Sequence, residues 1–156
     1  MLDTSSTVFP ASLTHKTIWP NSDGYDEGRK VWNGMIDRRP AMIVRCQTPG
    51  DVVASVNYAR DNHLVVAVRG GAHNVAGNAT CDDGMVIDLS LMKGVTVDPV
   101  ARTARAEAGC TWADLDQATH PFGLATTGGL VSTTGIAGFT LGGGIGWLMR
   151  KYGLTC

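Results

Sequence analysis

LVVAVRGGAHN, at residues 64–74, is the most informative stretch because an apolar run passes directly into a glycine-bearing loop. The apolar run 64–68 has the length and composition of a strand, and we expect it to be buried on both faces. Gly70 and Gly71 then let the backbone turn so that successive N–H groups face one point. Such a turn binds anionic oxygen, typically phosphate, and Arg69 adds positive charge beside it. A plain glycine turn between two strands remains the alternative.

The segments around this stretch predict further strands and helices. Thr48, Pro49 and Asp51 have the spacing of a capping box with proline in the first turn, which predicts a helix from residue 49 to about residue 62. Its expected buried stripe is Val52, Val53, Val56 and Ala59. Short strands are expected at residues 41–46, 85–89, 95–97 and 103–108, a short helix begins at residues 111–115, and one or two helical turns fall within residues 141–152.

The order of these elements predicts the fold class. One strand–helix–strand unit is followed by several short strands, rather than by further helix–strand repeats. This order favours an α+β fold over a repeating βαβ array. The glycine loop does not have the Gly-x-Gly-x-x-Gly spacing, and no helix signal follows it within a few residues. A Rossmann nucleotide site is therefore not supported.

The composition gives no indication of a nucleic acid or membrane partner and favours a cytoplasmic location. The chain has 156 residues, 44% of them hydrophobic and 17% charged, which is typical of one globular domain or part of a larger one. Thirteen Lys and Arg residues nearly balance 14 Asp and Glu residues, and no basic tract indicates a nucleic acid or membrane partner. The chain shows no secretory signal and no Cys-x-x-Cys pair, so we expect reduced thiols and a cytoplasmic location.

A second glycine-rich segment occupies the C-terminal third of the chain. Of the 20 glycines, 11 lie between residues 109 and 153, and residues 117–149 contain no Asp, Glu, Lys or Arg. Hydroxyl-bearing residues interrupt this stretch too often for a membrane-spanning helix, so we predict a buried, loop-rich segment. Small and hydroxylated residues would let the backbone approach a large, flat ligand closely. A tightly packed glycine-rich turn in the core would leave the same pattern.

One of the four histidines stands out. His73 is flanked by small residues in the glycine loop and is therefore sterically open to a ligand. His15, His63 and His120 have no comparable context, and we expect them to be ordinary hydrogen-bonded side chains. Because His73 has no metal-ligating partner at short spacing, no metal site is predicted.

Taken in chain order, these motifs resemble the FAD-binding domain of the p-cresol methylhydroxylase type, in the berberine bridge enzyme-like branch of flavin oxidases. Bacterial hydroxynicotine oxidases are similar members of this branch. The resemblance begins near residues 25–29 and extends to the last residue of the chain. It rests on residues 69–74, 85–90, 142–147 and 150–154.

The resemblance implies a domain organisation and a set of cofactor contacts. We expect a leader arm at residues 1–24, a first α+β FAD-binding subdomain at residues 25–92 and the start of a second at residues 93–156. His73 matches the histidine that carries the covalent bond to the flavin 8α-methyl carbon. The other matching cofactor-binding positions are Arg69, Gly70, Gly71, Ala72, Asn74, Gly77, Gly129, Thr133, Thr134, Gly135, Gly138, Gly143, Gly146 and Tyr152.

One departure from the family pattern predicts the number of covalent links. Doubly linked members carry a cysteine in the second glycine segment, and the matching position here is Val131. Valine cannot form a thioether. We therefore expect a single covalent link between FAD and the protein, through His73.

The resemblance also implies an activity. In the family, a small organic substrate gives a hydride to FAD, and dioxygen (O2) reoxidises the flavin to give hydrogen peroxide. The chain ends at Cys156, within a family motif, so we expect an N-terminal fragment that lacks the substrate domain and does not turn over alone. The catalytic base, the substrate and the oligomeric state stay open. The alternatives are a noncovalent or non-catalytic flavin-binding module and an inactive remnant.

Overall fold

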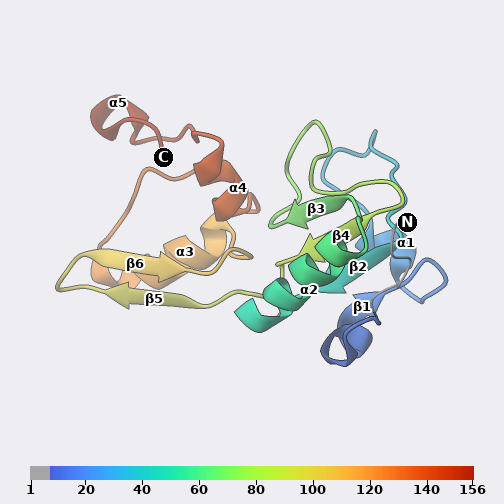
Figure 1. The fold of residues 1–156 in the computed structure, drawn as a ribbon. Coiled ribbons are helices and arrows are strands. Elements are labelled where there is room, and N and C mark those ends of the chain that lie inside the picture. The colour runs from blue at the N-terminus through green and yellow to red at the C-terminus, as the bar shows by residue number, and fades with distance from the viewer. Residues whose placement is uncertain (1–7) are drawn as a thin grey trace.

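A four-stranded sheet with the order β1-β2-β4-β3 forms the first lobe of the computed structural model, which describes residues 8–156 (Figure 1). The three strands β2, β4 and β3 run parallel, and β1 joins β2 in the antiparallel direction. The mixture of helices and strands confirms the predicted α+β class. The strands are β1 (Thr17–Ile18), β2 (Met42–Arg45), β3 (Val66–Arg69) and β4 (Met85–Asp88).

Helix α2 (Pro49–Asp61) connects β2 to β3 and begins with the predicted capping box. The Thr48 hydroxyl accepts the Asp51 N–H at 3.2 Å, and the Asp51 carboxylate accepts the Thr48 N–H at 3.0 Å. Lys16 Nζ also lies 2.7 Å from Asp51 Oδ1. Burial alone would raise the pKa of Asp51, but the ion pair and the backbone hydrogen bonds outweigh it and lower that pKa.

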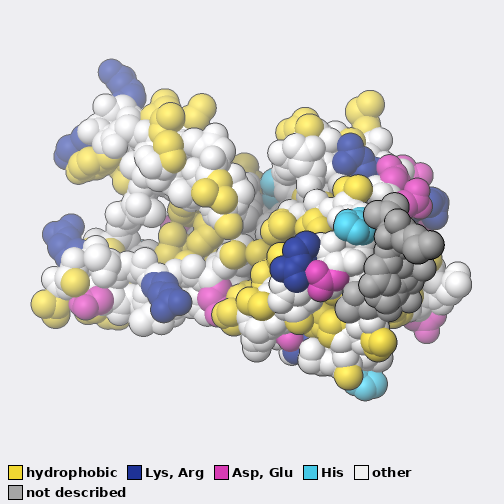
Figure 2. Space-filling view, in the orientation of Figure 1, with side chains coloured by type: hydrophobic (Ala, Val, Ile, Leu, Met, Phe, Trp, Pro, Cys, Tyr) yellow, Lys and Arg dark blue, Asp and Glu magenta, His cyan; other side chains and the backbone are white. Residues whose placement is uncertain are grey.

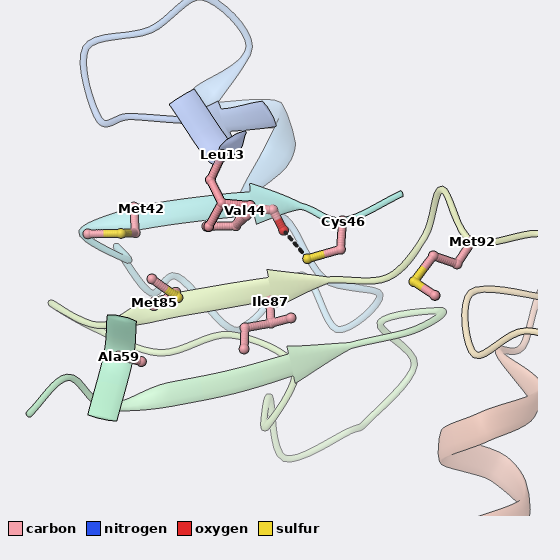
Figure 3. Close-up of a cluster of buried hydrophobic side chains, with 8 residues drawn as sticks. All are labelled: Leu13, Met42, Val44, Cys46, Ala59, Met85, Ile87 and Met92. Atoms are coloured by element: carbon pink, nitrogen blue, oxygen red, sulfur yellow. Dashed lines mark hydrogen bonds between the residues drawn. The ribbon is translucent and has the colours of Figure 1, made fainter. Parts of the chain in front are cut away.

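The main hydrophobic core lies between α2 and one face of the sheet, and Figure 3 shows its buried side chains. A smaller cluster covers the other face and includes Tyr25 of helix α1 (Tyr25–Gly28), whose hydroxyl donates to the Pro40 carbonyl at 2.7 Å. The sheet is thus buried on both faces over its central strands. The main core consists of Leu13, Met42, Val44, Cys46, Ala59, Met85, Ile87 and Met92.

The burial predicted for the stretch 64–68 and for helix α2 is wrong at several positions. The stretch 64–68 was expected to be buried on both faces, but β3 is an edge strand, and Val66 and Val68 are 41% and 57% exposed. Val53 and Val56 of α2 are also exposed, and Figure 2 shows hydrophobic side chains at the surface of this lobe. Of the predicted stripe, Ala59 is buried and Val52 packs against the main core. The other buried side chains of α2 are Asp51 and Ser55.

Part of the leader arm expected at residues 1–24 packs against the first lobe, and the expected boundary after residue 24 stays a prediction. Residues 1–7 lie outside the described residues, but the 3-10 helix η1 (Ala11–Lys16) places Leu13, fully buried, in the main core. Burial of a leucine side chain contributes about 2 kcal/mol, so η1 and β1 are parts of the first lobe. The expected division between residues 92 and 93 stays a prediction.

The second lobe contains a hairpin and short helices (Figure 1). Helix α3 (Trp112–Thr119) begins at the predicted position, and α5 (Met149–Tyr152) lies within the residues predicted to contain helical turns, while α4 (Ile136–Leu141) was not predicted. Trp112 and Phe139 join these two helices edge to face, with ring centroids 5.2 Å apart. No helix among residues 8–156 is long and apolar enough to cross a membrane. The elements are β5 (Val95–Asp98), β6 (Thr103–Ala106), α3 (Trp112–Thr119), η2 (His120–Phe122), α4 (Ile136–Leu141) and α5 (Met149–Tyr152).

Asp114 closes a second capping box at the start of α3. Its Oδ2 atom accepts hydrogen bonds from Lys93 Nζ at 2.6 Å and from the Thr111 N–H at 2.6 Å. Chiefly through Lys93, these contacts lower the pKa of Asp114 from 3.8 to about 2. Because folding lowers this pKa, the ionised carboxylate stabilises the folded protein above about pH 4. This stabilisation is lost as the pH falls through 2.

We therefore predict a pH-dependent effect of Asp114→Asn. The variant should lower the free energy of unfolding by about 1 kcal/mol at pH 7, the usual size of a capping contribution. The difference from wild type should shrink towards zero as the pH falls through 2. Urea unfolding at several pH values measures this, with Asp116→Asn on the exposed face of α3 as the control. An equal loss at neutral and acid pH would contradict the assignment.

Candidate functional site

Three charged side chains meet at the carboxyl edge of the first sheet. Because β2 and β3 both pair in parallel with β4, the register places Arg45 and Arg69 on either side of Asp88. Arg69 and Asp88 are buried, while Arg45 is exposed. The carboxyl edge is the usual ligand position in open sheets with parallel strands.

The buried guanidinium of Arg69 holds three chain segments together. Nε donates to the Ala79 carbonyl at 3.3 Å, Nη2 donates to the Arg29 carbonyl at 3.4 Å, and Nη1 donates to the Gly28 carbonyl. Burial lowers the pKa of Arg69, and the neighbouring Asp88 opposes this effect. An arginine stays charged at neutral pH, so Arg69 both braces these segments and places a positive charge beneath the site.

The loop after β3 presents unpaired backbone donors. Among residues 8–156, the N–H groups of Gly70, Gly71, Ala72 and His73 have no protein acceptor. Ala72 has φ 57°, a left-handed conformation that is uncommon for a residue with a side chain, and its carbonyl accepts the Trp32 N–H at 3.0 Å. Such strained residues, held in place by their surroundings, cluster at ligand sites. An anionic oxygen can accept from this row of donors.

The same loop meets the second glycine-rich segment in a direct backbone contact. A Cβ atom on Gly71 would overlap the backbone N and Cα of Gly135, and a Cβ on Gly135 would overlap those of Gly71. The second segment is in turn fixed to the start of α3, where the Trp112 N–H donates to the Thr134 carbonyl at 3.1 Å. The two glycine segments therefore form one continuous surface between the lobes, where Figure 2 shows a hollow.

Two cavities share the backbone of residues 70–72 as a wall. The larger has a volume of about 610 Å³ and lies at the carboxyl edge of the sheet. The smaller has a volume of about 340 Å³ and contains His73. Both volumes are within the usual range for small-molecule sites. The larger cavity is lined by charged side chains, which include Lys30, Arg45, Arg69, Asp88 and Lys93.

The His73 imidazole is held from two sides. The Trp32 ring stacks on it, with centroids 5.5 Å apart and an interplanar angle of 21°. Thr133 Oγ1 lies 3.3 Å from His73 Nε2. The Asn33 side chain fixes the position of Trp32, because its Nδ2 donates to the Val75 carbonyl at 2.8 Å.

The structure brings most of the predicted site residues to these cavities and leaves others apart. Gly77 has φ 77°, and its N–H closes the end of the loop on the Asn74 carbonyl at 3.0 Å. The positions outside the two cavities are Gly77, Gly129, Gly143, Gly146 and Tyr152, and their roles stay predictions. The predicted positions that line a cavity are Arg69, Gly70, Gly71, Ala72, His73, Asn74, Thr133, Thr134, Gly135 and Gly138.

Sequence reasoning did not single out several other residues of the site. Trp32 lies 41 positions before His73, and no local pattern predicts their stacking. Lys30, Arg45 and Lys93 belong to segments without a motif, and only the tertiary fold brings them to the larger cavity. Strand register is the one signal that could have placed Arg45 beside Asp88.

Comparison with known proteins places these features in a family. The sequence profile of the FAD binding domain family matches residues 40–156. The chain is 40% identical over 151 residues to (R)-6-hydroxynicotine oxidase of Paenarthrobacter nicotinovorans, covering 97% of this chain and 33% of that protein. It is 45% identical over 126 residues to an FAD-linked oxidoreductase of Dictyostelium discoideum, covering 81% of this chain and 27% of that protein.

Solved structures give the same result. The crystal structure of 6-hydroxy-D-nicotine oxidase from Arthrobacter nicotinovorans superposes with a TM-score of 0.90 at 40% identity, covering 96% of this chain and 33% of that one. The berberine bridge enzyme-like protein 1 of Physcomitrella patens gives a TM-score of 0.86 at 28% identity, covering 96% of this chain and 34% of that one. The chain thus spans about a third of the length of these relatives.

The glycine contact leads to a prediction about stability. Gly71→Ala and Gly135→Ala should each lower the free energy of unfolding by about 1–3 kcal/mol, the usual cost of overpacking, because neither backbone can move aside independently. Gly34→Ala is the matched control, since a Cβ there meets nothing within 4 Å. Urea unfolding measures all three variants. If Gly71→Ala is as stable as Gly34→Ala, the two backbones are not in contact in solution.

Proposed function

The chain belongs to the FAD binding domain family, and from this premise we propose that it forms the cofactor-binding part of an FAD-dependent oxidase. The proposed reaction moves a hydride from a small organic substrate to FAD, with dioxygen as the acceptor and hydrogen peroxide as the product. The relatives are named as FAD-linked oxidoreductases and oxidases, which supports this reaction class. We also propose a cytoplasmic location, because all four cysteines are free thiols.

The donors around the larger cavity fit the phosphate groups of FAD. The unpaired N–H groups of residues 70–73 can donate to the pyrophosphate, while Arg69 supplies charge from beneath the loop. Lys30 and Lys93 also line this cavity, where Lys30 is paired with Glu27 and Lys93 with Asp114. Because the guanidinium of Arg69 already donates to three carbonyls, we expect it to act on the phosphates through its charge rather than by direct contact.

The smaller cavity fits a flat ring next to a histidine. Thr134, Gly135 and Gly138 give part of its wall small side chains, so a planar group can approach the backbone there. The observation that carries the proposal is that His73 lines this cavity directly beside the unpaired donors of the loop. When bound, FAD would supply the two-electron redox chemistry, and the protein would place and orient it.

We propose a single covalent bond between FAD and the protein, at His73. The position at which doubly linked members carry a cysteine is Val131, which has no nucleophilic atom. The chemistry proposed for His73 is that of a nucleophile, whose ring nitrogen forms the bond to the flavin.

This chain spans about a third of the length of its relatives. We propose that the substrate-binding residues and the catalytic base belong to the region that corresponds to the other two thirds. One relative is a grass pollen allergen with glucose dehydrogenase activity, with a TM-score of 0.84 at 27% identity. A dehydrogenase with another electron acceptor is therefore the second candidate. Peroxide release during turnover of the full-length protein distinguishes the oxidase from the dehydrogenase.

Covalent attachment gives the direct test. The wild-type protein should gain the mass of one FAD that survives acid denaturation and maps to the peptide containing His73. His73→Ala should lose this mass increment while retaining noncovalent FAD binding, because the donors of the loop remain. Intact mass and the absorbance of the acid supernatant measure both forms, with the exposed His120→Ala as the control. Flavin that stays with denatured His73→Ala would refute the assignment.

A further inference from the structure

Two side chains from distant segments contact the His73 imidazole. Trp32 covers one face of the ring, with centroids 5.5 Å apart. Thr133, which lies 60 positions further along the chain, contacts the Nε2 edge at 3.3 Å. Among residues 8–156, the other ring nitrogen, Nδ1, has no hydrogen-bond partner. The two ring nitrogens are therefore in different environments before any ligand binds.

Trp32 is anchored on the loop that carries His73. Its N–H donates to the Ala72 carbonyl at 3.0 Å, and the next residue, Asn33, donates from its side chain to the Val75 carbonyl at 2.8 Å. These bonds lie on both sides of His73 in the sequence and place the Trp32 backbone against this loop, where its ring stacks on the imidazole. The stacked ring therefore restricts rotation of the imidazole.

Thr133 is anchored on the opposite wall. The next residue, Thr134, donates its N–H to the Val131 carbonyl at 3.1 Å and accepts the Trp112 N–H at 3.1 Å. The residue after that, Gly135, is in backbone contact with Gly71. These contacts place the Thr133 backbone opposite the loop that carries His73, with the hydroxyl within reach of the Nε2 edge.

We propose that Thr133 and Trp32 are positioning residues that select Nδ1 of His73 for the bond to the 8α carbon of FAD. This inference rests on the covalent link proposed above. The Thr133 hydroxyl accepts the Nε2–H, which leaves the lone pair of the neutral ring on Nδ1. By stacking on the ring, Trp32 restricts the flip that would exchange Nδ1 with Cδ2 and Nε2 with Cε1.

The proposed attachment balances in atoms and electrons. A bond forms between Nδ1 and the 8α carbon; the 8α methyl group loses one hydrogen, and the imidazole loses its Nε2 proton. Two electrons and two protons reduce one molecule of dioxygen to hydrogen peroxide. A hydroxyl at position 133 suits this change, because it accepts from Nε2–H before attachment and donates to Nε2 afterwards, which a carbonyl oxygen cannot do.

The test separates FAD binding from covalent attachment. Protein prepared without flavin is mixed with FAD in air, and the noncovalent affinity and the rate of covalent attachment at saturating FAD are measured separately. Thr133→Val should slow attachment about tenfold, the effect expected from losing one hydrogen bond to the reacting group. Nuclear magnetic resonance of the isolated flavin peptide should then show both Nδ1 and Nε2 linkages, in place of the Nδ1 linkage alone.

Matched variants complete the design. Thr133→Ser keeps the hydroxyl and should restore the rate and the Nδ1 linkage, while Thr126→Val removes an exposed hydroxyl elsewhere in the same segment and should change neither. Trp32→Leu should give mixed linkages, and Trp32→Phe, which keeps a stacking ring, should give less of the Nε2 product than Trp32→Leu.

Three results would overturn the inference. Attachment by Thr133→Val at the wild-type rate and through Nδ1 alone would show that the hydroxyl does not select the nitrogen, even if FAD affinity falls. An Nε2 linkage in the wild-type protein would show that the opposite nitrogen reacts. A wild-type protein that binds FAD but never attaches it would overturn the proposed covalent link as well.

Discussion

The backbone contact between Gly71 and Gly135 is the constraint on which the candidate site depends. It brings the loop after β3 against the segment before α4, although the two residues are far apart in the sequence. Any side chain at either position would separate these walls. The contact therefore determines the position of Thr133 relative to His73, and both cavities take part of their lining from each glycine segment.

Arg69, the backbone N–H groups of the loop and the His73 ring have different roles around this contact. Arg69 is buried, and its donors are taken by three carbonyls of two other segments, so its main effect is to hold the floor of the site together. The backbone N–H groups of residues 70–73 remain free to bind an anion. His73 lies at the end of this row of donors, where its ring faces the smaller cavity. Anion binding and nucleophilic chemistry thus meet in one loop.

The extent to which the sequence predicts this arrangement depends on how local each interaction is. Thr48, Pro49 and Asp51 lie within four residues, so the start of α2 could be predicted from the sequence alone. The strand near residues 64–68 was also found, but its burial was wrong because a run of valines does not reveal an edge position. The stacking of Trp32 on His73 depends on tertiary contacts, which no spacing rule describes.

The left-handed backbone at Ala72 has a consequence for the freedom of the loop. An alanine in this conformation costs roughly 1 kcal/mol in the folded state compared with a glycine. A glycine there would extend the pair at residues 70 and 71 to three in a row and enlarge the set of conformations open to the unfolded loop. The methyl group of Ala72 removes many of those conformations. The loop therefore loses less conformational entropy when it becomes ordered. The N–H groups of residues 70–73 are then arranged for binding before a ligand arrives.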